Sequence, residues 1–93
     1  MQFDWNERKA ESNLKKHGIS FAEAETVWGD YFYIDLFDEE HSFEENRYLI
    51  FGESAQTRLL VVSYTEKENC LRIISAREMT PKERRDYEQG HFE

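Results

Sequence analysis

The chain has little of several features that would narrow its function. Cysteine occurs once, at Cys70, which excludes an internal disulfide and a metal site with several cysteine ligands. No long apolar run is present, so we expect neither a signal peptide nor a membrane span, and we infer a cytoplasmic protein. Proline also occurs once, at Pro81, and there is no repeat or linker, so the sequence predicts one domain, 1–93.

Positive charge is scarce as well. Twelve Lys and Arg stand against twenty Asp and Glu, which gives a net charge of −8. Taken alone, this balance argues against a nucleic-acid binder and for a basic partner. The acids are concentrated, however, because residues 31–46 contain no Lys or Arg and six acids: Asp35, Asp38, Glu39, Glu40, Glu44 and Glu45.

The first third of the chain predicts a short strand and two helices. Residues 3–5 read as the strand, and the helix that follows ends at Gly18, a residue suited to the left-handed position after a helix. Ser20 and Glu23 have the spacing of a capping box, and Gly29 ends the second helix. Two short helices with a brief joint predict a helical hairpin.

The remainder predicts a small sheet and a last helix. Four segments rich in β-branched and aromatic residues read as strands: 31–37, 47–53, 58–64 and 70–76. Their short connections favour antiparallel pairing. Thr80, Pro81 and Glu83 start a helix that ends at Gly90. The expected fold is α+β, with the N-terminal helical hairpin and the C-terminal helix packed on a small antiparallel sheet.

Coverage of that sheet predicts an exposed surface. The two N-terminal helices can cover one face, whereas a single helix of about ten residues, ~15 Å long, leaves part of the other face open. An uncovered apolar face predicts a protein-binding surface. The alternative is that the acidic loop folds over it.

The sequence lacks the residue patterns that several kinds of chemistry require. The histidines His17, His41 and His91 are scattered, without the spacing of metal ligands, and no glycine-rich phosphate loop or nucleophile elbow occurs. We therefore expect no metal and no cofactor. The remaining Arg, Lys, Glu, Tyr and His suffice for RNA cleavage, which needs a base for the ribose 2′-OH, an acid for the leaving oxygen and cations for the phosphate.

Arginines near the strand ends are the first candidates. Arg77 near the end of the last strand reads either as a phosphate contact or as an ordinary ion pair with Glu78 or Glu83. Arg47 opens a strand and either meets Arg72 or Arg77 across the sheet or pairs with the acidic loop.

The other candidates each have an equally plain structural reading. Glu66 and Lys67 lie in a predicted hairpin turn, where charged residues are common. Arg84 and Tyr87 share a helix face and form either a site or a surface pair. His17 at a helix C-terminus serves either as an acid or as a cap stabilised by the dipole.

The motifs taken together are more specific than any one of them. The segments NLKKHGISF, RYLIFG, LLVVSYTEK and RIISAREMTPKERRDYE resemble the BrnT toxin family of bacterial type II toxin–antitoxin systems. The resemblance implies a RelE/ParE-like fold and a metal-independent ribonuclease that blocks translation. It also implies a BrnA-type antitoxin as partner. That antitoxin carries a DNA-binding domain, so contact with DNA is expected only indirectly, through the antitoxin.

The resemblance also implies site residues. Lys16 and His17 match a Lys-His-Gly element of the family, and Arg47 matches the arginine that opens a strand. Glu66 matches the glutamate of a Thr-Glu pair, and the last helix matches the C-terminal block of the family. The implied catalytic residues are Arg77, Arg47, Glu66, Tyr87 and His17. The implied RNA-binding residues are Lys16, Lys67, Arg72 and Arg84. Two positions depart from the family: Asn6 stands for an aspartate, and Lys67 stands for an arginine, which keeps the charge without the bidentate fork.

Two other functions stay open at the level of sequence. The acidic balance suits a ParE-like toxin that binds a protein such as DNA gyrase. A non-catalytic member kept for antitoxin binding and operon control would also carry these motifs. RNA integrity, DNA supercoiling and toxicity without the antitoxin distinguish the three.

Overall fold

The first and last helices begin at capping side chains and end at the glycines that the sequence predicts. In the computed structural model, which describes residues 1–92, α1 (Glu7–His17) starts at Asn6, whose side chain accepts hydrogen bonds from two backbone N–H groups. It ends at Gly18, which has a positive φ of 70°. Helix α3 (Pro81–Gln89) starts with the predicted capping box of Thr80 and Glu83.

The second helix is shorter than predicted. Ser20 accepts a hydrogen bond from the Glu23 N–H, but α2 (Phe21–Glu25) has five residues and continues as the 3₁₀ helix η1 (Thr26–Gly29). The Glu23 carboxylate does not turn back to the cap. It binds Ser54 and Arg58 instead. A helical hairpin of two comparable helices is therefore not confirmed.

The sheet has five strands and is mixed, so the prediction of an antiparallel sheet is wrong for one strand. Strands β2 (Ile34–Phe37), β3 (Arg47–Glu53), β4 (Leu59–Lys67) and β5 (Cys70–Glu78) pair antiparallel, and β1 (Gln2–Trp5) pairs with β5 in parallel. The order is β1-β5-β4-β3-β2. Turn signals determine only hairpins, whereas the β1–β5 pair joins segments separated by most of the chain.

Two connections are shorter or more structured than predicted. The β4–β5 hairpin turns on Glu68 and Asn69 alone, both with positive φ, so β4 extends through Glu66 and Lys67. The β2–β3 connection contains a short 3₁₀ turn, η2 (Glu39–His41).

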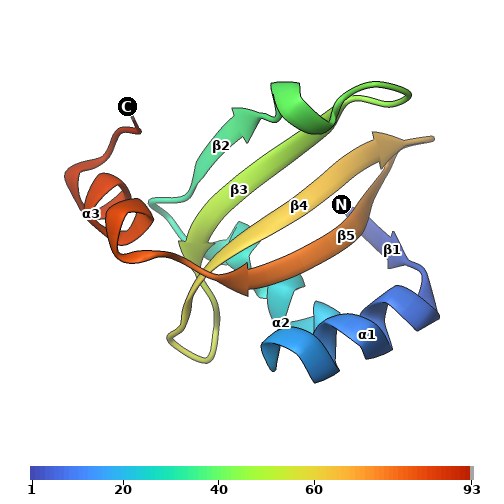
Figure 1. Ribbon diagram of the computed structural model, residues 1–93, viewed down its shortest axis with the longest axis horizontal. Coiled ribbons are helices and arrows are strands. Elements are labelled where there is room, and N and C mark those ends of the chain that lie inside the picture. Colours follow the sequence, from blue (N-terminus) through green and yellow to red (C-terminus); the bar gives the residue numbers. More distant parts are fainter. Residues whose placement is uncertain (93) are drawn as a thin grey trace.

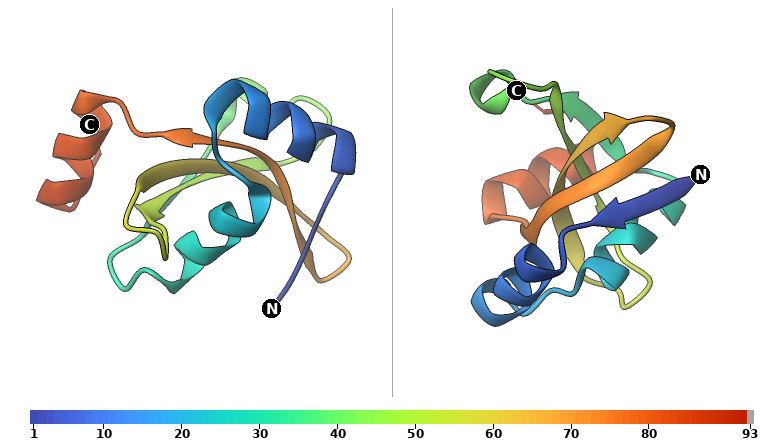
Figure 2. Two further views of the ribbon diagram at one scale, coloured as in Figure 1. Left: turned by 90° about the horizontal axis from the view of Figure 1, so that it is seen from below. Right: turned by 90° about the vertical axis from the view of Figure 1, so that its right-hand side faces the viewer.

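The helices cover the two faces of the sheet unequally. On one face, which we call the helix-covered face, buried side chains of β3, β4 and β5 pack against α2 and η1, which lie behind the sheet in Figure 1. On the other, which we call the open face, α3 packs only at one end, over Phe51, Val61 and Met79. The left view of Figure 2 shows α1 and α3 at different ends of the molecule. Strand β4 is thus buried on both faces at Leu60, Val61 and Val62, as its unbroken apolar run predicts.

Asn13 ties α1 to the edge of β5. Strand β1 pairs with β5 only as far as Ile73, so the backbone of β5 beyond that point has no strand partner on this side. The buried Asn13 side chain accepts a hydrogen bond from the Ala76 N–H at 3.0 Å and donates to the Ala76 carbonyl at 2.9 Å. This single amide therefore satisfies an edge that would otherwise remain open.

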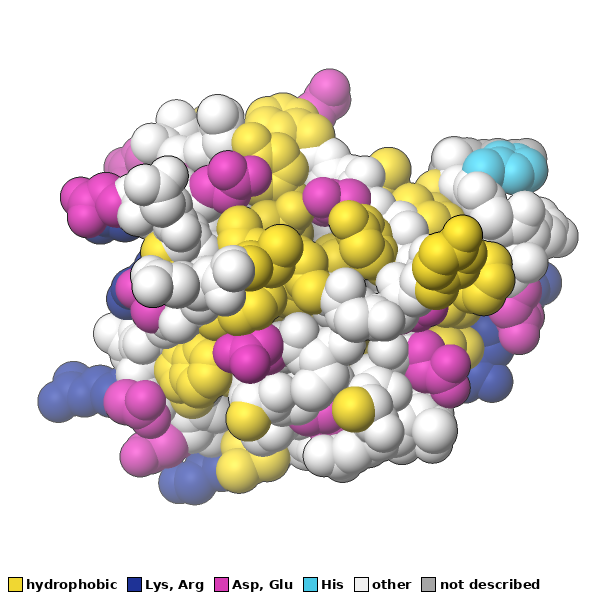
Figure 3. All heavy atoms as spheres, turned by 180° about the vertical axis from the view of Figure 1, so that it is seen from behind, with side chains coloured by type: hydrophobic (Ala, Val, Ile, Leu, Met, Phe, Trp, Pro, Cys, Tyr) yellow, Lys and Arg dark blue, Asp and Glu magenta, His cyan; other side chains and the backbone are white. Residues whose placement is uncertain are grey.

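Part of the exposed apolar surface lies on the side away from the open face, whereas Leu36 and Phe43 are exposed on the open side. A chain of aromatic contacts runs over the helix-covered face, linking Phe3, Trp28, Tyr64, Tyr48 and Phe37. Figure 3 shows hydrophobic side chains gathered in the middle of this side. The prediction of an uncovered apolar face was therefore half right, because the uncovered face itself carries polar and basic side chains. Within residues 1–92, no helix has the length and apolar character that crossing a bilayer requires.

Candidate functional site

Three predicted arginines share the open face. Arg47 on β3 and Arg72 on β5 both pair with Thr65 on β4, and Arg77 pairs with Val61 on the same face. Neighbouring strands lie ~4.8 Å apart, so the backbones at Arg47 and Arg72 lie ~10 Å apart. Because side chains alternate along each strand, register alone places these three guanidinium groups on one side of the sheet.

Arg47 and Arg72 make exposed ion pairs that a phosphate can replace. The Arg47 Nε lies 3.1 Å from a Glu45 carboxylate oxygen, and an Arg72 terminal nitrogen lies 3.2 Å from one of Asp4. Each pair has one short contact and is open to solvent, and such pairs contribute little to stability. Both side chains keep further N–H donors, which suit phosphate oxygens.

Arg77 has a firmer partner. Its two terminal nitrogens lie 2.8 and 3.0 Å from the two carboxylate oxygens of Glu83, which also caps α3. The hydrogen bond to Glu83 raises the pKa of Arg77, and the hydrogen bond from Arg77 lowers the pKa of Glu83. The structural reading of Arg77, an ion pair with Glu83, is thus present. This pair fixes α3 to the end of β5.

Tyr87 and Arg84 lie on α3 and do not meet. The Tyr87 hydroxyl donates to the Asp30 carboxylate, while Arg84 is exposed and has no side-chain partner within residues 1–92. Burial and this hydrogen bond raise the pKa of Tyr87. Burial alone would raise the pKa of Asp30, but hydrogen bonds from Tyr87 and from the backbone of Glu53 and Phe32 together lower it. This hydrogen bond therefore holds α3 against the turn before β2.

Glu66 lies on the opposite side of the sheet from the arginines. It follows Thr65 in β4 and pairs with Leu71, so its side chain belongs to the helix-covered face. There it contributes, after burial, to the raised pKa of Asp35, whose carboxylate accepts the Tyr64 hydroxyl at 2.8 Å. Lys67 lies at the end of β4, beside the hairpin. The prediction that Glu66 lies in the hairpin turn is wrong, because β4 continues through it and strand alternation turns its side chain away from Arg47 and Arg72.

Lys16 and His17 lie beside the sheet edge. Both line a shallow hollow with Lys9 of α1 and with Ile74 and Ser75 of β5. Ser75 pairs with Ser63, in the row between Arg72 and Arg77. The basic end of α1 thus borders the open face without lying over it.

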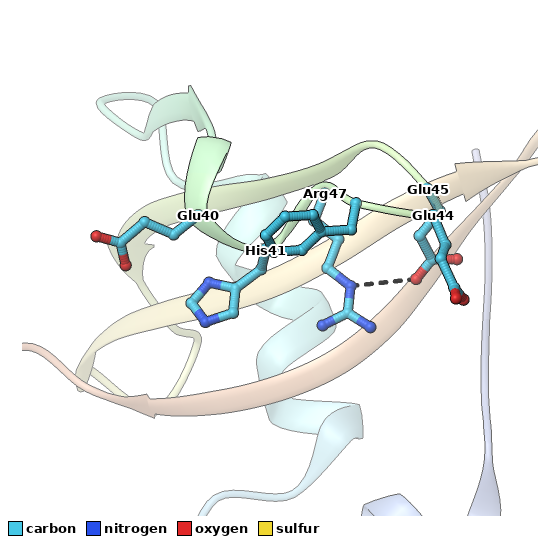
Figure 4. Close-up of a pocket in the computed structure, with 6 residues that line it drawn as sticks. Glu40, His41, Glu44, Glu45 and Arg47 are labelled. Carbon is cyan, nitrogen blue, oxygen red and sulfur yellow. Dashed lines mark hydrogen bonds and ion pairs between the residues drawn. The ribbon is translucent and has the colours of Figure 1, made fainter.

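His41, which is not among the predicted site residues, lies beside Arg47. His41 of η2 and Arg47 line one hollow of about 580 Å³ together with Glu40, Phe43, Glu44 and Glu45. Figure 4 shows the His41 imidazole and the Arg47 guanidinium projecting over the strands on the same side. In the sequence, Asp38 and His41 stand just before Arg47, at a spacing that matches no metal-ligand motif.

The donor types on this face suit phosphate rather than a coordinated metal. Within residues 1–92, no group of three or more His, Cys, Asp or Glu is arranged to hold a metal ion. Arginine forks, serine hydroxyls and one imidazole are groups that bind phosphate oxygens and move protons. The arrangement can therefore hold a phosphodiester along the Arg47–Arg72 row.

Comparisons with known proteins show the family to which this chain belongs. The chain matches a family model described as the ribonuclease toxin BrnT of type II toxin–antitoxin systems over residues 5–83. It shares its fold with the Brucella abortus ribonuclease toxin BrnT, solved at 1.1 Å, with a TM-score of 0.64 and 23% identity over 86% of this chain and 97% of that one. No curated protein gave a significant match. The chain belongs to the BrnT family of ribonuclease toxins of type II toxin–antitoxin systems.

Proposed function

We propose that this toxin is an endoribonuclease that cleaves RNA on the open face of the sheet without a metal ion, and thereby inhibits translation. The observation that supports this most directly is the row formed by Arg47, Thr65 and Arg72. The guanidinium groups of these two arginines, whose backbones lie ~10 Å apart, provide the positive charge that a pentacoordinate phosphate needs in its transition state.

The acidic net charge is compatible with RNA binding because Arg72, Lys16 and His17 lie away from the acidic residues 31–46, although Arg47 adjoins them. The six acids of residues 31–46 lie in β2 and in the β2–β3 connection, at one edge of the sheet. Arg72 lies on β5, and Lys16 and His17 lie at the other side of that strand. A single strand of RNA crossing from Arg47 to α1 would therefore move away from the acidic edge.

The proposed roles follow from these positions. Arg47 and Arg72 bind the reacting phosphate, and Lys16, Lys67 and His17 bind flanking phosphates at the borders of the face. Arg77 contributes positive charge while holding α3 through Glu83. Glu66 has no proposed proton-transfer role because it lies on the other face of the sheet. Tyr87 has none because its hydroxyl donates to Asp30. Arg84, exposed on α3, makes an outer contact with the RNA.

We further propose a RelE/ParE-like fold assignment and a BrnA-type antitoxin as the neutralising partner. The acidic β2–β3 connection suits a basic segment of that antitoxin, because opposite charges steer association. Occupation of this connection would cover the hollow beside Arg47 and so block the site. Contact with DNA would then come only through the antitoxin.

Purified toxin incubated with RNA in EDTA tests the proposal. We expect cleavage at full rate in EDTA, abolished by added antitoxin, and arrest of translation on induced expression, abolished by co-expression of the antitoxin. Intact RNA with blocked DNA supercoiling would support a gyrase inhibitor instead. Harmless expression without the antitoxin would support a non-catalytic member.

A further inference from the structure

We propose that His41 is the general base of the cleavage reaction and that Asp38 positions it. This inference rests on the proposed ribonuclease function and names the group that accepts the 2′-OH proton. It comes from a loop that carries none of the residues selected from the sequence.

Asp38 holds the imidazole in one orientation. The His41 Nδ1 lies 2.9 Å from an Asp38 carboxylate oxygen, and the Asp38 side chain is only 11% exposed, against 61% for His41. An ionised carboxylate can only accept, so Nδ1 carries the hydrogen, and in the neutral imidazole Nε2 then keeps its lone pair. A base needs this tautomer with its accepting nitrogen directed outward.

Ser42 fixes the loop that carries the pair. Its hydroxyl donates to the Asp38 carbonyl at 2.5 Å and accepts from the Arg47 N–H at 3.0 Å. The Asp38 N–H also donates to the Arg47 carbonyl at 2.8 Å. The backbone of Asp38 is therefore joined directly to that of Arg47, which couples the position of the base to that of the phosphate-binding arginine.

The surroundings of His41 leave Arg47 free to bind a phosphate. Glu40, Glu44 and Glu45 line the hollow that His41 shares with Arg47, and Asp38 contacts the imidazole. Glu45 pairs with the Arg47 Nε, which leaves the terminal nitrogens for phosphate. Figure 4 shows these nitrogens and the His41 imidazole over the same strands, so that a phosphate and a base can occupy adjacent places.

The proposed cleavage needs no reactant besides the RNA and water. The His41 Nε2 removes the proton from a ribose 2′-OH, and the oxygen attacks the adjacent phosphorus while Arg47 and Arg72 stabilise the phosphorane. The bond from phosphorus to the 5′-oxygen breaks, and the leaving oxygen takes a proton from water. The products are a 2′,3′-cyclic phosphate and a 5′-hydroxyl, and the imidazolium returns its proton to the hydroxide left by that water.

Single-turnover cleavage by His41→Ala and Asp38→Asn tests the proposal. We expect His41→Ala to lower the rate of cleavage ~100-fold or more, as loss of a general base does. Its affinity for an RNA with a 2′-deoxy sugar at the cleavage site should not change. Added imidazole should restore part of the rate, and Asp38→Asn should lower it to a smaller extent. His91→Ala, another exposed histidine, is the matched control and should retain full activity.

Three outcomes would overturn the assignment. If His41→Ala cleaves as fast as the wild type, the base lies elsewhere while the proposed ribonuclease function stands. If the wild type itself does not cleave RNA, both proposals fall. If a 5′-thio leaving group, which needs no proton, restores the rate of His41→Ala, then His41 is the acid rather than the base.

Discussion

At the scale of residues, Asp35 is the carboxyl whose surroundings oppose its ionised form. Burial raises the pKa of Asp35, and the negative charge of Glu66 adds to this, although the Tyr64 hydroxyl donates to both carboxylate oxygens. A raised pKa in the folded state favours folding below the unfolded value. That advantage is lost as the pH rises through the folded value.

Asp35→Asn should therefore be more stable than the wild type at pH 7, because an amide keeps an acceptor for Tyr64 without the charge. The gain should shrink as the pH falls below about 4, where the unfolded carboxyl is also protonated. Urea unfolding at both pH values measures this, with the exposed Glu44→Gln as the control. A variant less stable than the wild type at pH 7 would contradict the account.

Single residues also show what sequence spacing can and cannot predict. Ser20 caps α2 as its spacing predicts, but Glu23 leaves the cap to bind Arg58, 35 positions away. The hydrogen bond from Arg58 lowers the pKa of Glu23 despite burial. A local pattern identifies the cap because both partners lie within one turn. It cannot identify a partner that only the tertiary fold brings near.

At the scale of elements, α3 is held by contacts at both ends. The Arg77–Glu83 pair and the Thr80 cap fix its start, and the Tyr87 hydroxyl binds Asp30 further along. Tyr87→Phe removes one hydrogen bond to a charged group, worth about 1.5–3 kcal/mol. Amide exchange in residues 81–92 should therefore become ~10-fold faster or more, while exchange in β4 stays unchanged. Unchanged exchange in α3 would show that the helix is held by packing alone.

The contact of β3 with η1 requires a glycine. A Cβ on Gly52 would lie 2.9 Å from the Val27 Cγ1 and 3.1 Å from an Asp30 carboxylate oxygen. Gly52→Ala should destabilise the fold by about 1–3 kcal/mol, as overpacking does. Gly29→Ala is the matched control, since its Cβ would meet nothing within 4 Å. Equal thermal stabilities of the two variants would contradict this packing.

The elements themselves were largely predictable from the sequence, and their pairing only in part. Caps, hairpin strands and the buried character of β4 depend on local patterns that the sequence contains. The parallel β1–β5 pair and the two-residue turn at 68–69 do not. That turn moved Glu66 into a strand, and strand alternation then placed it away from Arg47. The structure confirms only the predicted proximity of Arg47 and Arg72 across the sheet, and their role in a site stays a prediction.

At the scale of the whole molecule, an acidic protein that binds RNA must use a few well-placed cations. Each phosphate contact with single-stranded RNA contributes about 0.7 to the slope of log affinity against log salt concentration. Arg72→Ala should therefore reduce that slope by about 0.7. Arg85→Ala removes the same charge from the exposed side of α3 and should leave the slope unchanged. Equal slopes for both variants would mean that Arg72 makes no phosphate contact.

The central claim is that the open face is the site of RNA cleavage, and one comparison tests it most directly. The rate of cleavage in EDTA is measured for Arg47→Ala/Arg72→Ala and for Arg8→Ala/Arg85→Ala, which remove the same charge from different surfaces. Losing transition-state donors costs on the order of 10²–10³-fold each, so the first pair should lower kcat/KM by at least ~10³-fold. The second pair should stay within about threefold of the wild type. Equal losses in the two pairs, or full activity in the first, would contradict the assignment of this face.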